Sequence, residues 1–536
     1  MLAKQPVHAE LYPLFSGHSS AGMLLCPKSQ RHHTIPIRFI TINGMFPRPL
    51  INATTNDVVH VNVFNNQDEP LLITWNGIQQ RLNSWQDRVS GSNCPIKAGS
   101  NWTCVFQSKD QTGTFTYLIL PSINFHEVSG GYGPIRLNNW NVFLVPFAKL
   151  EAKFDLLIGD WFVAECKEIR SLVKDSWGIP DVMLMNGKTR QTRVSNVGSV
   201  FSFNFRIQNH KMVLVETEGS YTNQIILDSL DVHVGQSYSV LVTANQDEAD
   251  YYMVASPKLL DTNFSNTPYL VGNGVLHYAN SVATIGGPVP NGPDPFDIEF
   301  SINQAKSVRW NLTTGAARPN PQGTFNVSNI TLTQTFILHG SKAEINGMLR
   351  YVVNNVSYLT PDTALKPADY FRNGSGVYEL DAFPVRSVND VAAYVTSVVT
   401  GVHKGWLEIV FNNDHEVMDS WHLDGFGLYV VGFGEGEWTP ESRNTYNLYD
   451  PVVRSTVQVY PGRWTAVYAF LDNPGMWNLR SQNLQHWYMG QELYIRVHND
   501  DPNPAKERPP PENLLLCGIL DESPSPYGAP APQPRW

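Results

Sequence analysis

One strand pattern occurs three times along the chain and constrains the fold more than any other feature. Each copy has a glycine, two spacer residues and then apolar residues that alternate with small or polar ones. The copies, with their glycines, are Cys94–Phe106 (Gly99), Val232–Val242 (Gly235) and Val459–Phe470 (Gly462). Period-two alternation after a glycine is typical of a half-buried strand that begins at a tight turn. Three copies predict three similar β-domains.

A second repeat supports this interpretation. Val58–Asn66 and Trp406–Asn413 both end in two asparagines, and an apolar strand follows each of them. The longest stretch with helical periodicity is short, Cys166–Lys174. Strands in this order, without long amphipathic helices, favour two-layer sheet packing. The predicted fold class is therefore all-β, with three tandem Greek-key β-sandwich domains.

Domain boundaries are predicted where the composition favours loops. A chain of 536 residues has room for three or four domains of about 150 residues. Pro146–Lys153 and the Gly- and Pro-rich stretch Gly286–Asp297 separate the strand-rich regions. The predicted units are a first domain at 35–153, a second at 154–290, a third at 320–500 and a Pro-rich tail at 501–536.

The charge and hydropathy patterns exclude two classes of partner. The 48 acidic residues outnumber the 38 basic ones, which gives a net charge of −10, and no basic stripe is visible. A nucleic-acid-binding surface is therefore not expected. No run of 18 apolar residues is present, so no segment is expected to span a membrane.

Several features favour secretion, although Met1–Cys26 has no apolar core that would identify a signal peptide. Eight Asn-x-Ser/Thr sequons mark candidate glycosylation sites, although chance alone produces several in a chain of this length. They are Asn52, Asn101, Asn263, Asn311, Asn326, Asn329, Asn355 and Asn373. We therefore expect an extracellular glycoprotein.

Four long motifs resemble a known family. They are I-T-W-N-G-I-Q-Q-R at Ile73–Arg81, N-S-W-Q-D at Asn83–Asp87, S-W-H-L-D-G at Ser420–Gly425 and D-N-P-G-M-W-N-L-R-S at Asp472–Ser481. They occur in the order found in the plant ascorbate-oxidase-like proteins of the skewed-root-growth and pollen group, which are relatives of the multicopper oxidases. The resemblance covers roughly Thr41 to Cys517. It implies that the three β-sandwiches are cupredoxin-like.

The resemblance also implies copper chemistry, which can be tested residue by residue. An active multicopper oxidase has a mononuclear copper held by two His, a Cys and usually a Met, and a trinuclear cluster held by four His-x-His pairs. The residues at these twelve positions here are Thr74, Asn76, Leu118, Leu120, Asp419, His422, Asp424, Arg480, Ser481, Gln482, His486 and Gln491. Ten of the twelve are not the expected ligand. Ser481 is no soft ligand for copper, and Arg480 places a fixed cation where copper should bind.

His422 and His486 are the two retained ligands, and two interpretations of them stay open. They could form a weak residual metal site, or each could be a hydrogen-bonded interior histidine, which is the interpretation that we favour. Asp419 and Asp424 could act as an acid–base pair on a glycan. We expect instead that they fill vacated ligand positions and bond to Arg480 or to backbone amides. No cofactor is expected, or copper if the family function is retained.

The family pattern further implies a disulfide between Cys94 and Cys517, which would tie the tail to the first domain. The other three cysteines have no assigned partner. Leu514–Cys517 is the one apolar run in the Pro-rich tail, and we expect it to dock before a mobile end. Compared with the family, Met185–Asn196 lacks a strand, so the second domain is expected to be one strand short.

Three functional hypotheses follow. The first is a secreted, non-catalytic glycoprotein of the plant cell wall, expected to be monomeric and to act in directional cell expansion or pollen-tube growth. The alternative is a copper-dependent oxidoreductase that acts on ascorbate or phenols with dioxygen. A third is that the vacated cleft binds a partner, either a wall polysaccharide or a protein. The net charge of −10 disfavours a polyanionic pectin and favours a neutral glucan or a protein.

Overall fold

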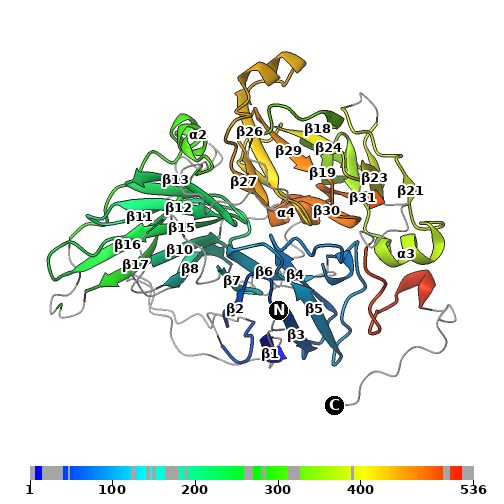
Figure 1. Cartoon of the computed structure of the whole chain (residues 1–536), viewed down its shortest axis with the longest axis horizontal. Coiled ribbons are helices and arrows are strands. Elements are labelled where there is room, and N and C mark those ends of the chain that lie inside the picture. The colour runs from blue at the N-terminus through cyan, green and yellow to red at the C-terminus, as the bar shows by residue number, and fades with distance from the viewer. Residues whose placement is uncertain are drawn as a thin grey trace.

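The computed structural model places the strands in three groups along the chain (Figure 1). Its described residues are 7–14, 40–45, 49–87, 89–121, 128, 130–139, 145, 147, 153–162, 180–186, 191–258, 270–278, 281, 285, 287–311, 326–387, 391–498 and 507–521. No helix within these ranges is long and apolar enough to cross a membrane.

The first domain is a sandwich of two sheets. One sheet has the order β1-β3-β5 and the other β2-β7-β6-β4. β1 lies before the predicted start at residue 35 and pairs in parallel with β3. The elements are β1 (Val7–Leu14), β2 (Ile51–Thr54), β3 (Val58–Asn65), β4 (Leu71–Asn76), the 3-10 helix η1 (Ser84–Gln86), β5 (Asn101–Gln107), β6 (Gly113–Pro121) and β7 (Tyr132–Asn138).

The second domain has a six-stranded sheet, β13-β12-β15-β10-β8-β9, and a four-stranded sheet, β14-β11-β16-β17. The stretch expected to lack a strand contains part of β9 and all of β10, and the loss of a strand relative to the family stays a prediction. The elements are β8 (Phe154–Trp161), β9 (Val182–Asn186), β10 (Gln191–Asn196), β11 (Ser202–Ile207), β12 (Met212–Thr217), β13 (Ser220–Leu227), β14 (Ser229–Val232), β15 (Ser237–Val242), β16 (Asp250–Lys258) and β17 (Gly272–His277).

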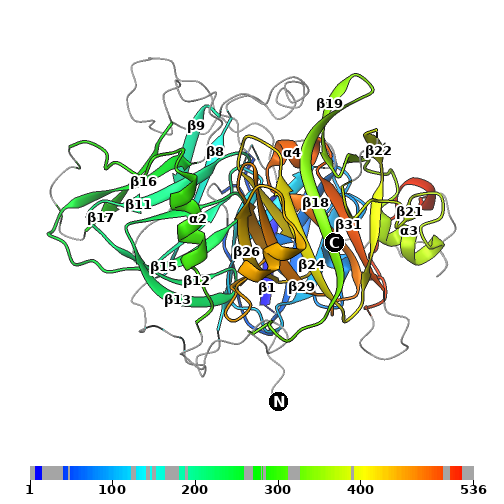
Figure 2. The same ribbon diagram turned by 90° about the horizontal axis from the view of Figure 1, so that it is seen from above.

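A helix that the sequence pattern did not indicate, α2 (Ile298–Ser307), follows the second domain. Asp297 caps it by accepting a hydrogen bond from the Phe300 backbone N–H. Tyr460 of the third domain donates its hydroxyl proton to the Ser301 carbonyl at 3.0 Å. The helix thus lies between the sheets of the second and third domains, as Figure 2 shows.

The third domain has an eight-stranded sheet, β22-β20-β19-β18-β24-β29-β26-β27, and a six-stranded sheet, β21-β23-β31-β30-β25-β28. Its strands are β18 (Leu332–Ile345), β19 (Met348–Val353), β20 (Val356–Tyr358), β21 (Glu379–Leu380), β22 (Ala393–Val395), β23 (Ser397–Val402), β24 (Trp406–Asn413), β25 (Asp419–Leu423), β26 (Leu428–Glu435), β27 (Val453–Arg454), β28 (Thr456–Val459), β29 (Arg463–Phe470), β30 (Gly475–Ser481) and β31 (Glu492–His498). Its helices are α3 (Leu365–Arg372), η3 (Pro440–Thr445) and α4 (Leu484–Tyr488).

The repeated glycine turns begin the strands that the sequence predicts. Gly99, Gly235 and Gly462 have φ angles of 70°, 79° and 62°, a left-handed conformation that side chains disfavour. They precede β5, β15 and β29, each of which pairs with a neighbouring strand of its own domain. The all-β fold with three sandwich domains is therefore confirmed.

The tail is attached to the body of the molecule by the bond that the family pattern implies. Cys94 and Cys517 form a disulfide, with Cα atoms 5.8 Å apart. Leu515 packs against the first-domain core, and the Trp85 indole N–H donates to the Arg508 carbonyl at 2.9 Å. The short helix η4 (Gly518–Leu520) follows the disulfide. Residues 522–536, where a mobile end is expected, lie outside the described part of the chain.

Candidate functional site

The positions that would bind a trinuclear copper cluster lie between the first and third domains. On the first-domain side, Thr74 of β4 pairs with Leu118 of β6. Leu118 and Leu120 are 4% and 1% exposed and belong to an apolar cluster that includes Met476 and Tyr494 of the third domain. Hydrocarbon side chains cannot bind a metal, so this half of the position is part of the interdomain core.

A buried polar network fills the other half. Arg480 of β30 donates from Nη1 to Oδ2 of Asp424 at 2.5 Å, and both side chains are at most 2% exposed. His422 of β25 has both ring nitrogens within hydrogen-bonding distance of a partner, Oγ1 of Thr456 and Oδ1 of Asp424, each at 2.9 Å. Asp424 therefore contacts both a cation and an imidazole. Part of the sequence interpretation is thus correct, because Asp424 does bond to Arg480.

The first domain contributes a second carboxyl group to this network. Thr74 donates its hydroxyl proton to Oδ1 of Asp87 at 2.8 Å. Burial and the nearby Asp424 raise the pKa of Asp87 well above its usual range. Burial alone would also raise the pKa of Asp424, but Arg480 and His422 together hold it below its usual range. These opposite shifts favour the protonated form of Asp87 and the ionised form of Asp424, whose charge Arg480 balances.

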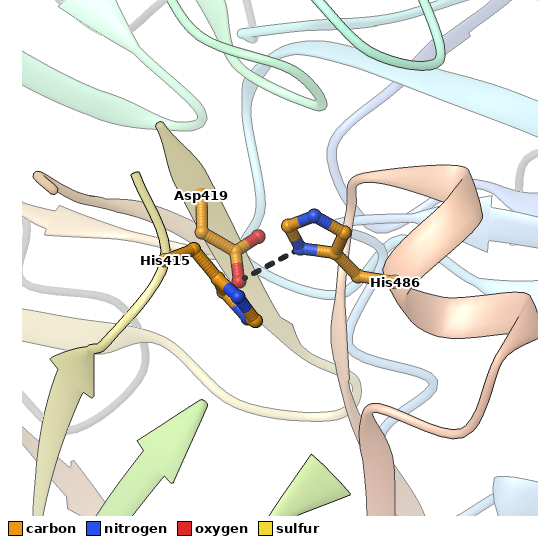
Figure 3. Close-up of side chains that lie close together, drawn as sticks. All are labelled: His415, Asp419 and His486. Atoms are coloured by element: carbon orange, nitrogen blue, oxygen red, sulfur yellow. Dashed lines mark ion pairs between the residues drawn. The ribbon is translucent and has the colours of Figure 1, made fainter. Parts of the chain in front are cut away.

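The mononuclear copper position has a different character. Asp419 at the start of β25, His486 in α4 and His415 in the turn after β24 converge there (Figure 3). One ligand atom from each lies within 4.8 Å of the others, and all three residues are buried. Oδ2 of Asp419 is 3.4 Å from Nδ1 of His486. Nδ1 has no hydrogen-bond partner among the described residues.

Neighbouring polar groups fix the carboxylate and one imidazole of this cluster. Ser481 donates its hydroxyl proton to Oδ1 of Asp419 at 2.5 Å, and Gln491 donates from Nε2 to Oδ2 at 2.6 Å. The Ser420 backbone N–H also donates to Asp419 at 2.8 Å, the kind of backbone bond expected for this residue. Oε1 of Gln491 lies 3.0 Å from Nε2 of His415. The residues that occupy the Cys and Met positions thus hold Asp419 in place.

Burial determines the protonation state of His415, whereas the neighbours of Asp419 determine the protonation state of Asp419. Burial lowers the pKa of His415 to about 3, so its imidazole is neutral at physiological pH. Burial would raise the pKa of Asp419, but His486, His415 and Ser481 hold it below its usual range. The cluster therefore contains an ionised carboxylate beside a neutral imidazole.

The two predicted residual ligands therefore have different surroundings. His422 is part of the Asp424 network and has no unoccupied ring nitrogen, which agrees with an interior, hydrogen-bonded histidine. His486 faces His415 and Asp419 instead. The shared metal site of His422 and His486 stays a prediction, and the hydrogen bonds of His422 with Asp424 and Thr456 disfavour it. His415 lies outside the family motifs, so motif comparison missed it.

One sequence signal does place His415 in a defined turn. Asn413 ends β24, and its Oδ1 accepts the His415 backbone N–H at 3.0 Å. In the first domain, Asn65 ends β3 and accepts the Gln67 backbone N–H in the same way, also at 3.0 Å. The paired asparagines therefore mark an Asx turn after each strand. The repeat locates the turn, but it does not show that the side chain two residues later points at His486.

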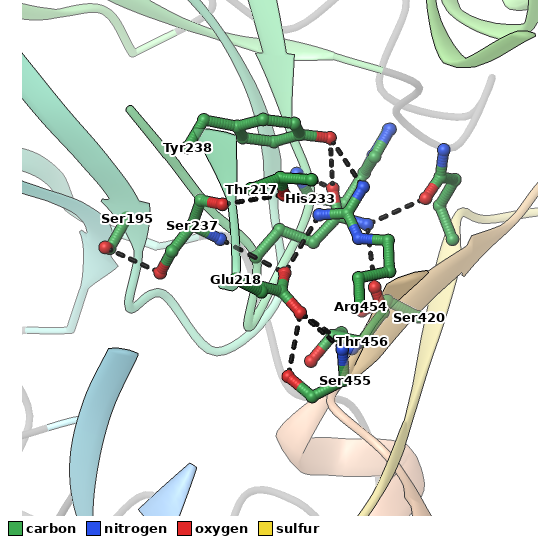
Figure 4. Close-up of polar contacts among 12 residues, drawn as sticks. Ser195, Thr217, Glu218, His233, Ser237, Tyr238, Ser420, Arg454, Ser455 and Thr456 are labelled. Carbon is green, nitrogen blue, oxygen red and sulfur yellow. Dashed lines mark hydrogen bonds and ion pairs between the residues drawn. The ribbon is translucent and has the colours of Figure 1, made fainter. Parts of the chain in front are cut away.

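A third polar cluster joins the second and third domains (Figure 4). Glu218 accepts hydrogen bonds from Arg454 at 2.9 Å, from the backbone N–H and hydroxyl of Ser455, both at 2.7 Å, and from the Thr456 N–H at 3.0 Å. Arg454 also donates to the Tyr238 hydroxyl at 2.9 Å. Both oxygens of Glu218 have partners, so this carboxylate holds the two domains together and is not available to a ligand. Nε of Arg454 has no hydrogen-bond partner among the described residues.

The glycosylation candidates differ in exposure. Asn311 is only 6% exposed, which disfavours a glycan there, because a glycan needs open space. Asn263 lies outside the described residues. Asn101 and Asn355 are half-buried. The exposed candidates are Asn52, Asn326, Asn329 and Asn373.

Comparisons with known proteins place these observations in a family. Models described as multicopper oxidase match residues 28–141, 156–281 and 362–503. The chain therefore belongs to the multicopper oxidase family, with three cupredoxin domains.

The chain is 44% identical over 518 residues to monocopper oxidase-like protein SKU5 of Arabidopsis thaliana, which covers 91% of this chain and 87% of that protein. It is 42% identical over 515 residues to an L-ascorbate oxidase homolog of Brassica napus, which covers 92% of this chain and 91% of that protein. Among solved structures, the multicopper oxidase Fet3p superposes with a TM-score of 0.71 at 20% identity, covering 86% of both chains. That likeness concerns the fold alone.

The residues present do not fit the copper centres that the family implies. A trinuclear cluster would lie against two leucines and a buried guanidinium, and the positive charge of Arg480 repels further cations. A blue mononuclear copper needs a thiolate, but Ser481 presents a hydroxyl that is bonded to Asp419.

Proposed function

We propose that the protein is a secreted, non-catalytic member of the multicopper oxidase family that acts in the plant cell wall, in directional cell expansion or pollen-tube growth. One observation supports the non-catalytic part above all others. The trinuclear position contains the buried Asp424–Arg480 ion pair and the apolar side chains of Leu118 and Leu120. Dioxygen reduction by this fold requires several copper ions at that position, so without them the site at which dioxygen would accept electrons is absent.

Secretion has support from covalent chemistry. The Cys94–Cys517 disulfide requires an oxidising compartment to form and persist. Four of the eight sequons have exposed asparagines, which an extracellular glycosylated surface requires. The plant relatives agree with a plant setting, and the role in cell expansion rests on the family resemblance alone.

The most direct test is oxygen uptake by purified protein with ascorbate and with a phenol, alongside copper analysis. We expect no uptake above buffer and no strong visible absorbance from copper. The alternative, a copper-dependent oxidoreductase, predicts turnover together with near-stoichiometric copper. If turnover occurs and persists after His422→Ala and His486→Ala together, copper at the motif positions is not its source.

A non-catalytic role requires a partner, for which we propose a neutral wall polysaccharide or a protein. Trp75, Trp421 and Trp477 are at most 1% exposed, so these indoles pack in the core and offer no stacking platform to a sugar. A glycan array probed with the secreted protein tests the polysaccharide. Retention of a neutral glucan supports it, and no retained glycan leaves the protein partner, which crosslinking in the wall would then identify.

A further inference from the structure

The strongest unexplained feature of the molecule is the buried cluster of His415, Asp419 and His486. Three chain segments bring these side chains together. Asn413 fixes the turn that carries His415, and β25 pairs with β28 and positions Asp419. The side chain of Asn483 caps α4 by accepting the backbone N–H of Gln485 at 3.1 Å and places His486 in the first turn of that helix. The cluster is therefore built on fixed backbone.

The spacing of one pair of donor atoms matches a metal site, and the third donor lies within 4.8 Å of both. Nδ1 of His486 and Oδ2 of Asp419 are 3.4 Å apart, beyond a good hydrogen bond. With metal–ligand bonds of about 2.1 Å, the edge of a coordination tetrahedron is about 3.4 Å. The rings of His415 and His486 have centroids 4.6 Å apart, so both can face one ion.

A second, independent observation points to a ligand. The side chain of His486 is 1% exposed, and its Nδ1 has no hydrogen-bond partner within the part of the chain that the structure describes. A buried polar atom without a partner costs about 1–3 kcal/mol, so native proteins rarely contain one without a reason. A cation bound between Nδ1 and the carboxylate would supply that partner.

The surroundings resemble the outer shell of a metal centre. Metal-binding side chains are usually oriented by hydrogen bonds from a second layer of residues. Gln491 contacts both Asp419 and His415, and Ser481 binds the other oxygen of the carboxylate. Tyr351 stacks on the His486 ring with a centroid distance of 4.2 Å. Each of the three candidate ligands is thus held by at least one neighbour.

We propose that His415, Asp419 and His486 bind one divalent ion of the borderline class, such as Zn²⁺. Two imidazoles and a carboxylate suit Zn²⁺, and the absence of a thiolate or thioether from this cluster disfavours Cu(I). Cys104 is buried in the first-domain core, away from this cluster. The ion performs no redox chemistry and joins the turn after β24, strand β25 and helix α4. The inference goes beyond the proposed function, because it holds whatever partner the protein binds.

The test is native mass spectrometry with elemental analysis of the full secreted chain. Because the cluster is buried, the ion enters during folding, so the protein is produced in medium with zinc and then dialysed against a chelator. We expect one zinc per chain. His486→Gln and His415→Asn should each lower the zinc content at least about tenfold. The matched control is His422→Gln, a buried histidine of the same strand as Asp419, which should leave zinc unchanged.

Cobalt gives a readout that does not depend on the variants' folding. Protein produced with Co²⁺ should show the visible spectrum of a four-coordinate ion without a sulfur charge-transfer band. Absence of any bound ion in the unmodified protein overturns the proposal, as does zinc retained in the His415→Asn and His486→Gln double variant. A six-coordinate cobalt spectrum indicates surface binding and also overturns it. Oxygen uptake in zinc-loaded protein would contradict the proposed function but not the zinc site.

Discussion

The two vacated copper positions differ in the charges that they contain. In the trinuclear position, Nη1 of Arg480 is paired with Asp424 and both nitrogens of His422 have partners, although Nε and Nη2 of Arg480 have none among the described residues. In the mononuclear position, Asp419 is fully engaged, but Nδ1 of His486 has no hydrogen-bond partner among the described residues. In the trinuclear position, the ion pair balances its own charge, so no metal ion is needed there. The mononuclear position still presents donor atoms to an ion.

The difference shows two ways in which a metal site can change without harm to the fold. Replacing ligands with a cation and an anion removes any need for a metal, because the pair balances its own charge. Retaining one histidine and placing a new one beside a carboxylate changes the preferred metal instead. The trinuclear position therefore serves to hold the first and third domains together. The mononuclear position keeps a capacity for binding.

The largest expected effect comes from breaking the Asp424–Arg480 network. Arg480→Met leaves the buried carboxylate of Asp424 without its cation, which should lower the free energy of unfolding by about 3–5 kcal/mol. Adding Asp424→Leu removes the unpaired charge, so the double variant should recover a large part of that loss. Chemical denaturation of the three proteins measures both values. A double variant no more stable than Arg480→Met would show that the network does not act as an ion pair.

A second prediction concerns pH and the same network. Asn478 accepts a hydrogen bond from Arg480 and donates one to Glu492. Burial raises the pKa of Glu492 to about 7 from an ordinary value of 4.5. The folded state therefore favours the protonated acid. The stability that this group contributes is complete below pH 4.5 and is lost as the pH rises toward 7. The loss amounts to about 3 kcal/mol, because one pKa unit is worth about 1.4 kcal/mol.

Comparison with Glu492→Gln isolates this effect. The variant lacks the ionisation, so the stability difference between it and the unmodified protein should change by about 3 kcal/mol between pH 4.5 and 7.5, in favour of the variant at high pH. His233 and His415, whose pKa values burial lowers to about 3, act in the opposite direction in both proteins and cancel. A difference that does not vary with pH would mean that Glu492 is ionised throughout.

The sequence predicted the fold better than it predicted the site, and particular residues show why. The strands after Gly99, Gly235 and Gly462 can be predicted from the local sequence, because a glycine turn and period-two alternation involve neighbouring residues only. Helix α2 was missed, because it follows a Pro-rich stretch and is a single short element. Its position depends on contacts to both adjacent domains, such as that of Tyr460 with Ser301.

The site depends on contacts between distant segments, which no local pattern encodes. The motif positions of Asp419 and His486 were identified correctly from the family. His422 was grouped with His486, although its partners are Asp424 and Thr456. His415 has no motif of its own, and only packing of the β24 turn against α4 brings its ring near His486. Which histidines converge was therefore a question of tertiary structure.

The smallest expected effect tests whether His486 is retained for the fold or for a ligand. In metal-free protein, His486→Gln should lower the free energy of unfolding by only about 1 kcal/mol, mainly through the lost stacking on Tyr351. Nδ1 makes no close hydrogen bond, and its contact with Oδ2 of Asp419 is long, at 3.4 Å. In protein produced with zinc, the difference in stability between the unmodified protein and the His486→Gln variant should increase, because only the unmodified chain gains binding energy. Thermal unfolding with and without zinc measures both differences. If His486→Gln lowers the free energy of unfolding of the metal-free protein by about 3 kcal/mol or more, His486 is needed for the fold itself. The mononuclear position would then resemble the Asp424–Arg480 network, which stabilises the fold without a ligand.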